Sequence, residues 1–72
     1  MNGIHVDIIE SFKDIPLIKS VMINPTVHVT AYLDVSLENK DSNLDILVIK
    51  KKKDLMKKYP YMILDVKYRI KN

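Results

Sequence analysis

The chain contains no cysteine, a single glycine and no long apolar run. Without cysteine, no disulfide can cross-link the fold and no thiolate can bind a metal. Because Gly3 is the only glycine, a glycine-rich phosphate-binding loop is excluded, and no serine lies in the glycine context of a nucleophile. The longest apolar run, Ile46–Ile49, is far shorter than the roughly 20 residues needed to cross a bilayer.

The size of the chain predicts one small domain, residues 1–72. A hydrophobic fraction of 47% is typical of globular proteins. A chain of this length buries only about 60% of the surface that it exposes when unfolded, and self-association often compensates for such a small core. We therefore expect a homodimer or a protein partner. Residues 1–7 do not have the pattern of a signal peptide, so we predict a cytoplasmic protein with no membrane partner.

Charge is divided unevenly along the sequence. Residues 1–43 carry three cations and six anions, a net charge of −3, whereas residues 44–72 carry nine cations and three anions, a net charge of +6. The basic part includes four consecutive lysines, Lys50–Lys53. A field of that sign attracts phosphate groups or an acidic protein surface.

Two segments alternate between apolar and polar residues, which predicts strands with one buried face. In residues 26–38, the apolar positions run from Val27 to Leu37. In residues 62–71, they run from Met62 to Ile70. A further strand is predicted over residues 17–23, with a turn at Asn24-Pro25.

Two other segments have helical spacing. In residues 4–14, Ile4, Ile8 and Phe12 share a face, and Pro16 ends the helix. In residues 44–59, one face is formed by Leu44, Val48, Leu55 and Tyr59. Ser42 or Asn43 is the expected N-cap, and Pro60 stops the helix. The alternative divides this second segment into a strand, residues 44–49, and a helix, residues 51–59, because Ile and Val favour strands. We favour the single helix.

The element order is therefore α-β-β-α-β, or α-β-β-β-α-β in the alternative. The natural packing is an α+β domain with a three- to four-stranded, mainly antiparallel sheet and helices on one face.

No constellation of residues indicates catalysis. His5 and His28 are the only histidines, and their spacing matches no metal-binding motif. Asp34 and Asp65 are expected on the solvent-exposed faces of their strands, in weak surface ion pairs with Lys67 or Arg69. We predict a non-enzymatic protein with no catalytic residue, no metal site, no cofactor and no small-molecule substrate.

The function predicted from these features is a protein-interaction or oligomerisation module that homodimerises through its sheet. The expected sheet face consists of His28, Thr30, Tyr32 and Asp34. An acidic patch with Asp34 and Glu38 would contact a basic patch of the second subunit, formed by Lys67, Arg69 and Lys71. The outer strand edges offer main-chain pairing as another route to the same dimer.

The alternative prediction is nucleic-acid binding. Six basic residues would track a phosphate backbone or contact an acidic partner: Lys50, Lys53, Lys57, Lys67, Arg69 and Lys71. Three tyrosines interleave with them and would stack on bases: Tyr59, Tyr61 and Tyr68. Against this, Tyr59 and Tyr68 are in phase with core residues, and arginine, which binds phosphate with two parallel hydrogen bonds, is nearly absent.

Two resemblances to known families accompany these patterns. The element order of residues 15–72, with Lys58-Tyr59-Pro60 followed by the strand Leu64–Arg69, resembles the cytoplasmic C-terminal domain of cation diffusion facilitators. The resemblance implies half of a ferredoxin-like fold and a metal-binding dimer. Where that family tends to place metal-binding histidines, this chain has Tyr32 and Arg69.

Residues 41–48 are similar to the paired-aspartate strand of small nucleotidyltransferases. Asn43 takes the place of the first metal-binding aspartate, and the upstream Gly-Ser is missing. This second resemblance therefore does not imply activity.

Overall fold

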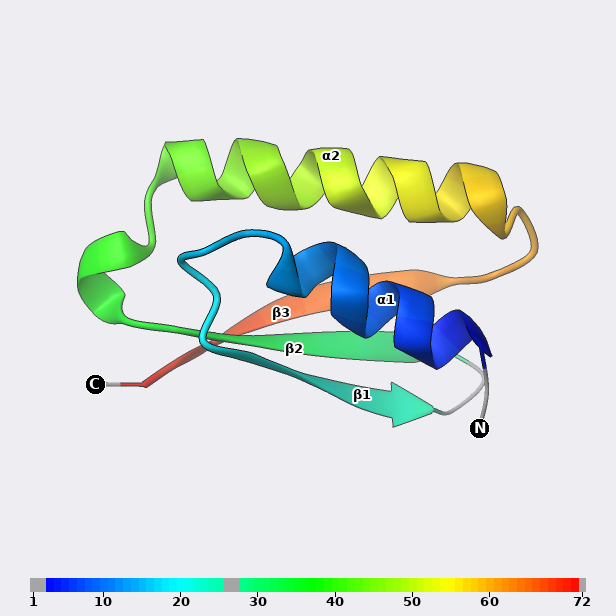
Figure 1. Cartoon of the computed structure of the whole chain (residues 1–72), viewed down its shortest axis with the longest axis horizontal. Helices are drawn as coiled ribbons and strands as arrows, with labels where there is room; N and C mark the ends of the chain where they lie inside the picture. The colour runs from blue at the N-terminus through cyan, green and yellow to red at the C-terminus, as the bar shows by residue number, and fades with distance from the viewer. Residues whose placement is uncertain (1–2, 26–27, 72) are drawn as a thin grey trace.

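The computed structural model describes residues 3–25 and 28–71, which form two helices beside a three-stranded sheet (Figure 1). The elements are α1 (Gly3–Lys13), β1 (Ser20–Pro25), β2 (Val29–Val35), a short 3-10 helix (Leu37–Asn39), α2 (Ser42–Lys58) and β3 (Leu64–Ile70). Both helices lie on the same face of the sheet. The predicted α+β class is confirmed.

The sheet is mixed, and β2 is its central strand. β2 runs antiparallel to β1, with Asp34 opposite Ser20, and parallel to β3, with Asp34 opposite Arg69. A parallel pairing needs a long crossover connection, and α2 supplies it. We predicted a mainly antiparallel sheet, whereas the observed sheet has one antiparallel pairing and one parallel pairing.

The core is centred on alternate residues of β2. Ala31, Leu33 and Val35 are completely buried, as their period-two spacing predicts. The strand is shorter than predicted, because the Asn39 N–H donates to the Ser36 carbonyl and turns the chain into the 3-10 helix. Leu37, predicted in the core, is consequently 63% exposed. Thr26 and Val27, the first two predicted strand residues, lie outside the described residues.

The first strand is displaced from its predicted position. The Ile18 N–H donates to the Ile15 carbonyl in a turn, so β1 begins only at Ser20. Asn24 and Pro25, predicted as a turn, instead end β1 and stand opposite Thr30 and Val29.

α2 is one continuous helix, which confirms the favoured prediction and rejects a strand at residues 44–49. Leu44, Val48 and Leu55 bury one side of it, and this packing overrides the strand preference of Ile and Val. The N-cap is Asp41 rather than Ser42 or Asn43, because the Asp41 side chain accepts a hydrogen bond from the Leu44 N–H at 2.9 Å. The segment that resembles a nucleotidyltransferase strand is therefore a helix start.

α1 buries Ile8 and Phe12 and is tied to α2 by polar contacts. Lys58 Nζ lies 2.7 Å from Asp7 Oδ2, and the Tyr59 hydroxyl also donates to Asp7. Hydrogen bonds from Lys58 and Tyr59 lower the pKa of Asp7. Lys51 pairs with Asp14 at 2.9 Å. Exposed pairs of this kind contribute little individually, so apolar burial is the main stabilising term.

Replacing Leu33 tests the placement of this core. Leu33→Ala is expected to lower the free energy of unfolding by about 2–5 kcal/mol, because it leaves a cavity in the buried row of β2. Leu37→Ala, the matched control at an exposed position, is expected to change it by less than about 0.5 kcal/mol. Urea unfolding measures both, and equal losses would contradict the assigned burial.

Candidate functional site: the open side of the sheet

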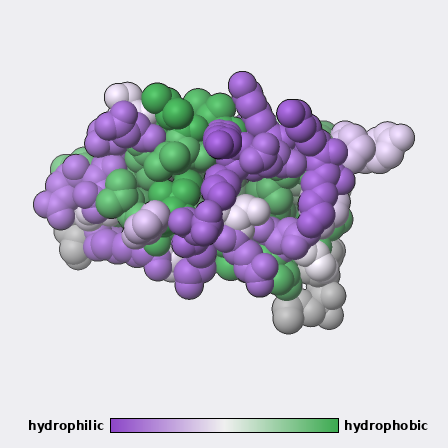
Figure 2. Space-filling view, turned by 45° about the horizontal axis from the view of Figure 1, so that its top comes forward, coloured by the Kyte–Doolittle hydropathy of each residue, from purple (hydrophilic) through white to green (hydrophobic). Residues whose placement is uncertain are grey.

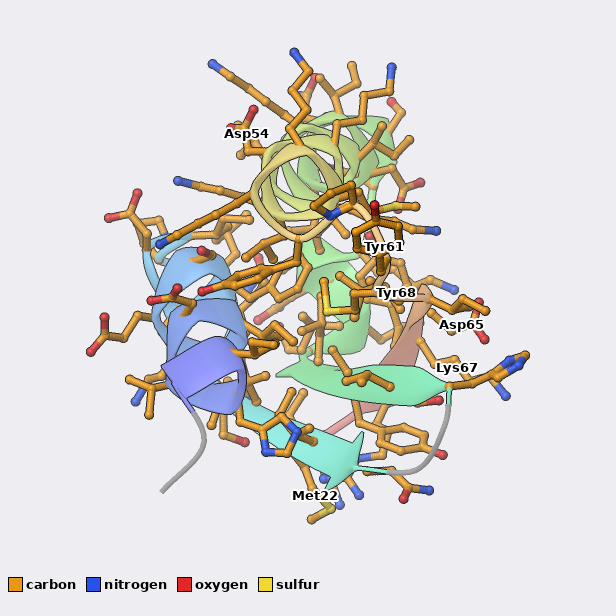
Figure 3. The ribbon with its side chains drawn as sticks, turned by 90° about the vertical axis from the view of Figure 1, so that its right-hand side faces the viewer. Met22, Asp54, Tyr61, Asp65, Lys67 and Tyr68 are labelled. Atoms are coloured by element: carbon orange, nitrogen blue, oxygen red, sulfur yellow. The ribbon has the colours of Figure 1, made fainter. Side chains whose placement is uncertain are left out.

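The helices leave one face of the sheet uncovered. The strand register places three residues of each strand on that side: Ser20, Met22, Asn24, Thr30, Tyr32, Asp34, Asp65, Lys67 and Arg69. We call these residues the open face. Figure 3 shows Met22 projecting from the side of the sheet opposite to the helices.

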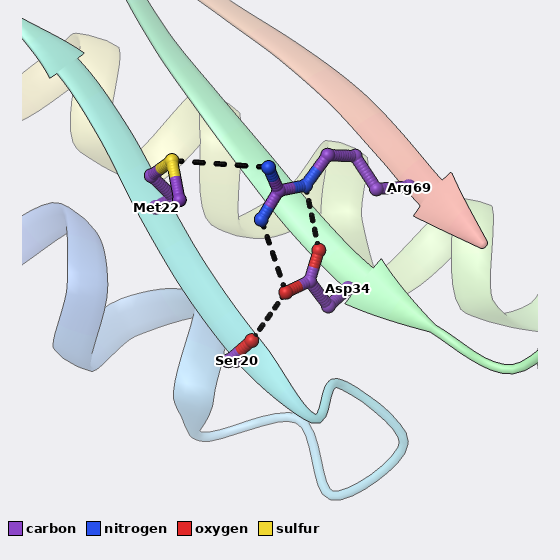
Figure 4. Close-up of polar contacts among 4 residues, drawn as sticks. All are labelled: Ser20, Met22, Asp34 and Arg69. Carbon is purple, nitrogen blue, oxygen red and sulfur yellow. Dashed lines mark hydrogen bonds and ion pairs between the residues drawn. The ribbon is translucent and has the colours of Figure 1, made fainter. Parts of the chain in front are cut away.

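Arg69 lies across the centre of the open face and binds residues from the other two strands (Figure 4). Its Nε donates to Asp34 Oδ1 at 2.8 Å, and its Nη2 donates to Asp34 Oδ2 at 3.2 Å. Nη1 contacts the Met22 sulfur at 3.8 Å, and the guanidinium carbon lies 5.5 Å from the centroid of the Tyr32 ring. Two parallel hydrogen bonds and a cation–π contact hold the guanidinium in one orientation.

Asp34 is buried beneath this guanidinium, with only 7% of the residue exposed. Hydrogen bonds from Arg69, and then from the Ser20 hydroxyl, lower the pKa of Asp34 to about 2 and outweigh burial, which raises it. The prediction of a solvent-exposed Asp34 in a weak surface pair is therefore wrong about its exposure. Of the two predicted partners, Lys67 and Arg69, it is Arg69 that pairs with Asp34.

This intramolecular pair changes the predicted dimer contact. Asp34 was expected to meet the basic patch of a second subunit, but Arg69 of the same chain neutralises it. Glu38 lies in the 3-10 helix and not on a strand. Of the other predicted face residues, Thr30 and Tyr32 are half-buried, and His28 is exposed just before β2.

Ser20, Met22 and Asn24 are the open-face residues that the sequence did not identify. All three belong to the displaced strand β1, opposite Asp34, Tyr32 and Thr30. Their place on the open face depends on the register of β1 against β2, and the spacing of residues within one strand does not predict that register.

The six predicted basic contact residues do not form one surface. Lys50, Lys53 and Lys57 line a groove of about 340 Å³ on the outer side of α2, beside Ile46 and Ile49. Figure 2, which brings the α2 side forward, shows hydrophobic and hydrophilic groups adjoining there. The other three residues belong to the strand side of the molecule. Lys67 and Arg69 lie on the open face, and Lys71 follows β3, where its N–H donates to the Val35 carbonyl.

The three predicted base-stacking tyrosines are also separated. The Tyr59 hydroxyl donates to Asp7, and the Tyr68 hydroxyl donates to Asp45 at 2.6 Å. Burial, together with the hydrogen bond to Asp45, raises the pKa of Tyr68. Tyr61 is exposed in the turn between α2 and β3. Two of the three rings are therefore half-buried parts of the fold, in agreement with their phase in the sequence.

A second groove runs between α2 and the outer side of β3. It has a volume of about 270 Å³ and is lined by Asp45, Val48, Ile49, Lys52, Val66 and Tyr68. Figure 3 places Tyr68, Asp65 and Lys67 together on this side of the molecule. We use the name β3 side for this groove together with four exposed residues of α2 and of the segment that contains β3: Ile49, Met56, Ile63 and Ile70.

Comparison with known proteins defines the fold. No protein-family model and no curated protein matches this chain. Among solved structures, a nickel form of the MamM C-terminal domain is similar at 14% identity, with all of both chains covered and a TM-score of 0.65. A copper form of the same domain covers all of this chain and 87% of its own, with a TM-score of 0.66. The chain therefore has the ferredoxin-like type of α+β fold.

The residues of this chain do not fit a metal ion at the two positions that the family resemblance indicates. Tyr32 and Arg69 are indeed neighbours on the open face, but they contact each other through the guanidinium and the ring. A protonated guanidinium has no lone pair for a metal. Within residues 3–25 and 28–71, no group of three or more histidines, aspartates and glutamates is arranged to hold one.

Neither α1 nor α2 is long and apolar enough to cross a bilayer.

The Asp34–Arg69 pair predicts a specific acid sensitivity. Because the folded-state pKa of Asp34 is lowered from 3.8 to about 2, its stabilisation is present above pH 3.8 and is lost as the pH falls through 2. Asp34→Asn should lower the melting temperature at neutral pH and reduce its further fall between pH 4 and pH 2. Asp54→Asn, at an exposed position of α2, is the control and should keep the wild-type profile. An unchanged acid profile in Asp34→Asn would contradict the assigned role.

Proposed function

We propose that this chain is a non-enzymatic interaction module that forms a homodimer through its sheet. The observation that carries the proposal is the gathering of large aliphatic side chains on the β3 side. Ile49 is 52% exposed and Met56 is 41% exposed, and both lie on the flank of α2 that borders the groove. Ile63, just before β3, is 51% exposed, and Ile70, the last residue of β3, is 41% exposed.

Spacing along α2 supports the assignment of these side chains to one surface. Ile49, Lys52 and Met56 are three and four residues apart, so they lie above one another on the same side of the helix. Ile49 and Lys52 line the groove with Val66 and Tyr68 of β3. Contiguous apolar surface of this kind is typical of protein contacts, whereas single exposed aliphatic residues are not.

The open face is the other surface through which the sheet could pair. Its only largely exposed apolar side chain is Met22 among the residues described there, and its centre is neutralised by the Asp34–Arg69 pair. It therefore supports the proposal less strongly than the β3 side. Nucleic-acid binding is not proposed, because its six basic residues are divided between α2 and the strand side.

Oligomeric state tests the proposal directly. Sedimentation equilibrium of the wild-type chain should give twice the 8.4 kDa mass of one subunit. Met56→Lys should weaken the dimer by roughly tenfold or more, because a charge would be placed in a desolvated apolar contact. A monomer at every concentration of the wild-type chain would contradict the proposal.

Two further variants locate the contact. Leu47→Lys is the matched control, because Leu47 is 44% exposed on the same helix but lies about 200° around it from Ile49. It should leave the dimer unchanged. Met22→Lys reports on the open face, and dissociation by this variant but not by Met56→Lys would move the contact there.

A further inference from the structure

We infer that the free edge of β3 pairs antiparallel with β3 of a second copy, joining two three-stranded sheets into one. This inference rests on the proposed dimer and specifies its contact. The sheet order places β3 at an edge, with β2 as its hydrogen-bonded neighbour. An uncovered strand edge presents a row of main-chain donors and acceptors to any strand that reaches it.

The hydrogen bonds of β3 identify the groups on its free edge. The Ile63 carbonyl accepts from the Val29 N–H at 3.0 Å, and the Lys71 N–H donates to the Val35 carbonyl at 2.7 Å. The main-chain groups of the odd-numbered residues of β3 therefore point toward β2. Because successive residues of a strand alternate, the N–H and C=O groups of the even-numbered residues point to the free edge: Leu64, Val66, Tyr68 and Ile70.

The opposite edge of the sheet, on β1, is less suited to pairing. β1 ends at Pro25, which has no N–H to donate. It is also a residue shorter than β3. The β3 edge, with seven residues and the adjoining groove, is the better template.

Charge on β3 selects a second copy as the partner. If Val66 stands opposite Val66 of the partner subunit, Asp65 stands opposite the partner's Lys67 on both sides of the two-fold axis. Moving the axis to Lys67 places that lysine against the partner's Lys67. Moving it to Tyr68 places Lys67 against the partner's Arg69. Like charges directly opposite each other destabilise a strand pair, so the register centred on Val66 is favoured.

The same pairing covers the exposed apolar residues of the β3 side. A two-fold axis perpendicular to the sheet brings the two α2 helices together as antiparallel neighbours. The flank of α2 that carries Ile49 and Met56 then faces the same flank of the partner's α2, above side chains of both β3 strands. The groove of about 270 Å³ between α2 and β3 would receive apolar side chains from the partner's β3 strand. One arrangement thus occupies the free main-chain edge and buries the exposed aliphatic groups.

A charge exchange tests this register. Asp65→Lys and Lys67→Asp each place like charges opposite each other at two symmetry-related sites, so each should weaken the dimer by about tenfold. The double variant restores opposite charges and should return the dissociation constant to within about threefold of the wild-type value. Both side chains are exposed and have no hydrogen-bond or ion-pair partner among the residues described, so neither change should unfold the chain.

The outcomes separate this inference from the proposed function. Sedimentation equilibrium is measured for the wild-type chain, the two single variants and the double variant, and circular dichroism checks that each is folded. If the single variants weaken the dimer and the double variant does not restore it, the register is wrong. If the wild-type chain is a dimer and all three variants dimerise as tightly as it does, the contact lies elsewhere. The edge pairing is then overturned, while the proposed dimer stands. A monomeric wild-type chain would overturn both.

Discussion

The central position of β2 is the constraint on which the rest of the structure depends. Its core-facing row fills the interior beneath both helices, and its main chain bonds to β1 on one side and to β3 on the other. On its open side, Asp34 binds Ser20 of β1 and Arg69 of β3. One buried carboxylate therefore links all three strands, and its guanidinium partner is held in place by the same contact.

The uneven charge of the sequence has a structural role in this arrangement. The ion pairs of the described residues join the acidic first part of the chain to the basic second part: Asp7 to Lys58, Asp14 to Lys51 and Asp34 to Arg69. The first two connect α1 and the residue that follows it to α2, and the third connects β2 to β3. The charge division thus accounts for contacts within one subunit. The remaining lysines of α2 lie on a surface separate from those of β3.

The sequence predicted the features that depend on local spacing. The period-two row of β2 and the helical stripe of α2 are both observed, because each buries one face against the same core. The displaced start of β1 and the choice of Asp41 over Ser42 as N-cap depend on turn geometry that several neighbouring residues could adopt. The burial of Asp34 could not be predicted from the sequence, because it depends on the register of two strands whose paired residues, Asp34 and Arg69, are 35 positions apart in the chain. The open-face residues Ser20, Met22 and Asn24 were missed for the same reason.

A three-stranded sheet covered on one face leaves one edge whose hydrogen bonds are free to form with another chain. Amide hydrogen exchange of Val66 and Tyr68 tests that claim most directly, because their N–H groups point to the β3 edge. The account predicts slow exchange at concentrations where the chain is dimeric and fast exchange after dilution to the monomer. Fast exchange of both amides in the dimer would show that β3 remains unpaired and would contradict the account.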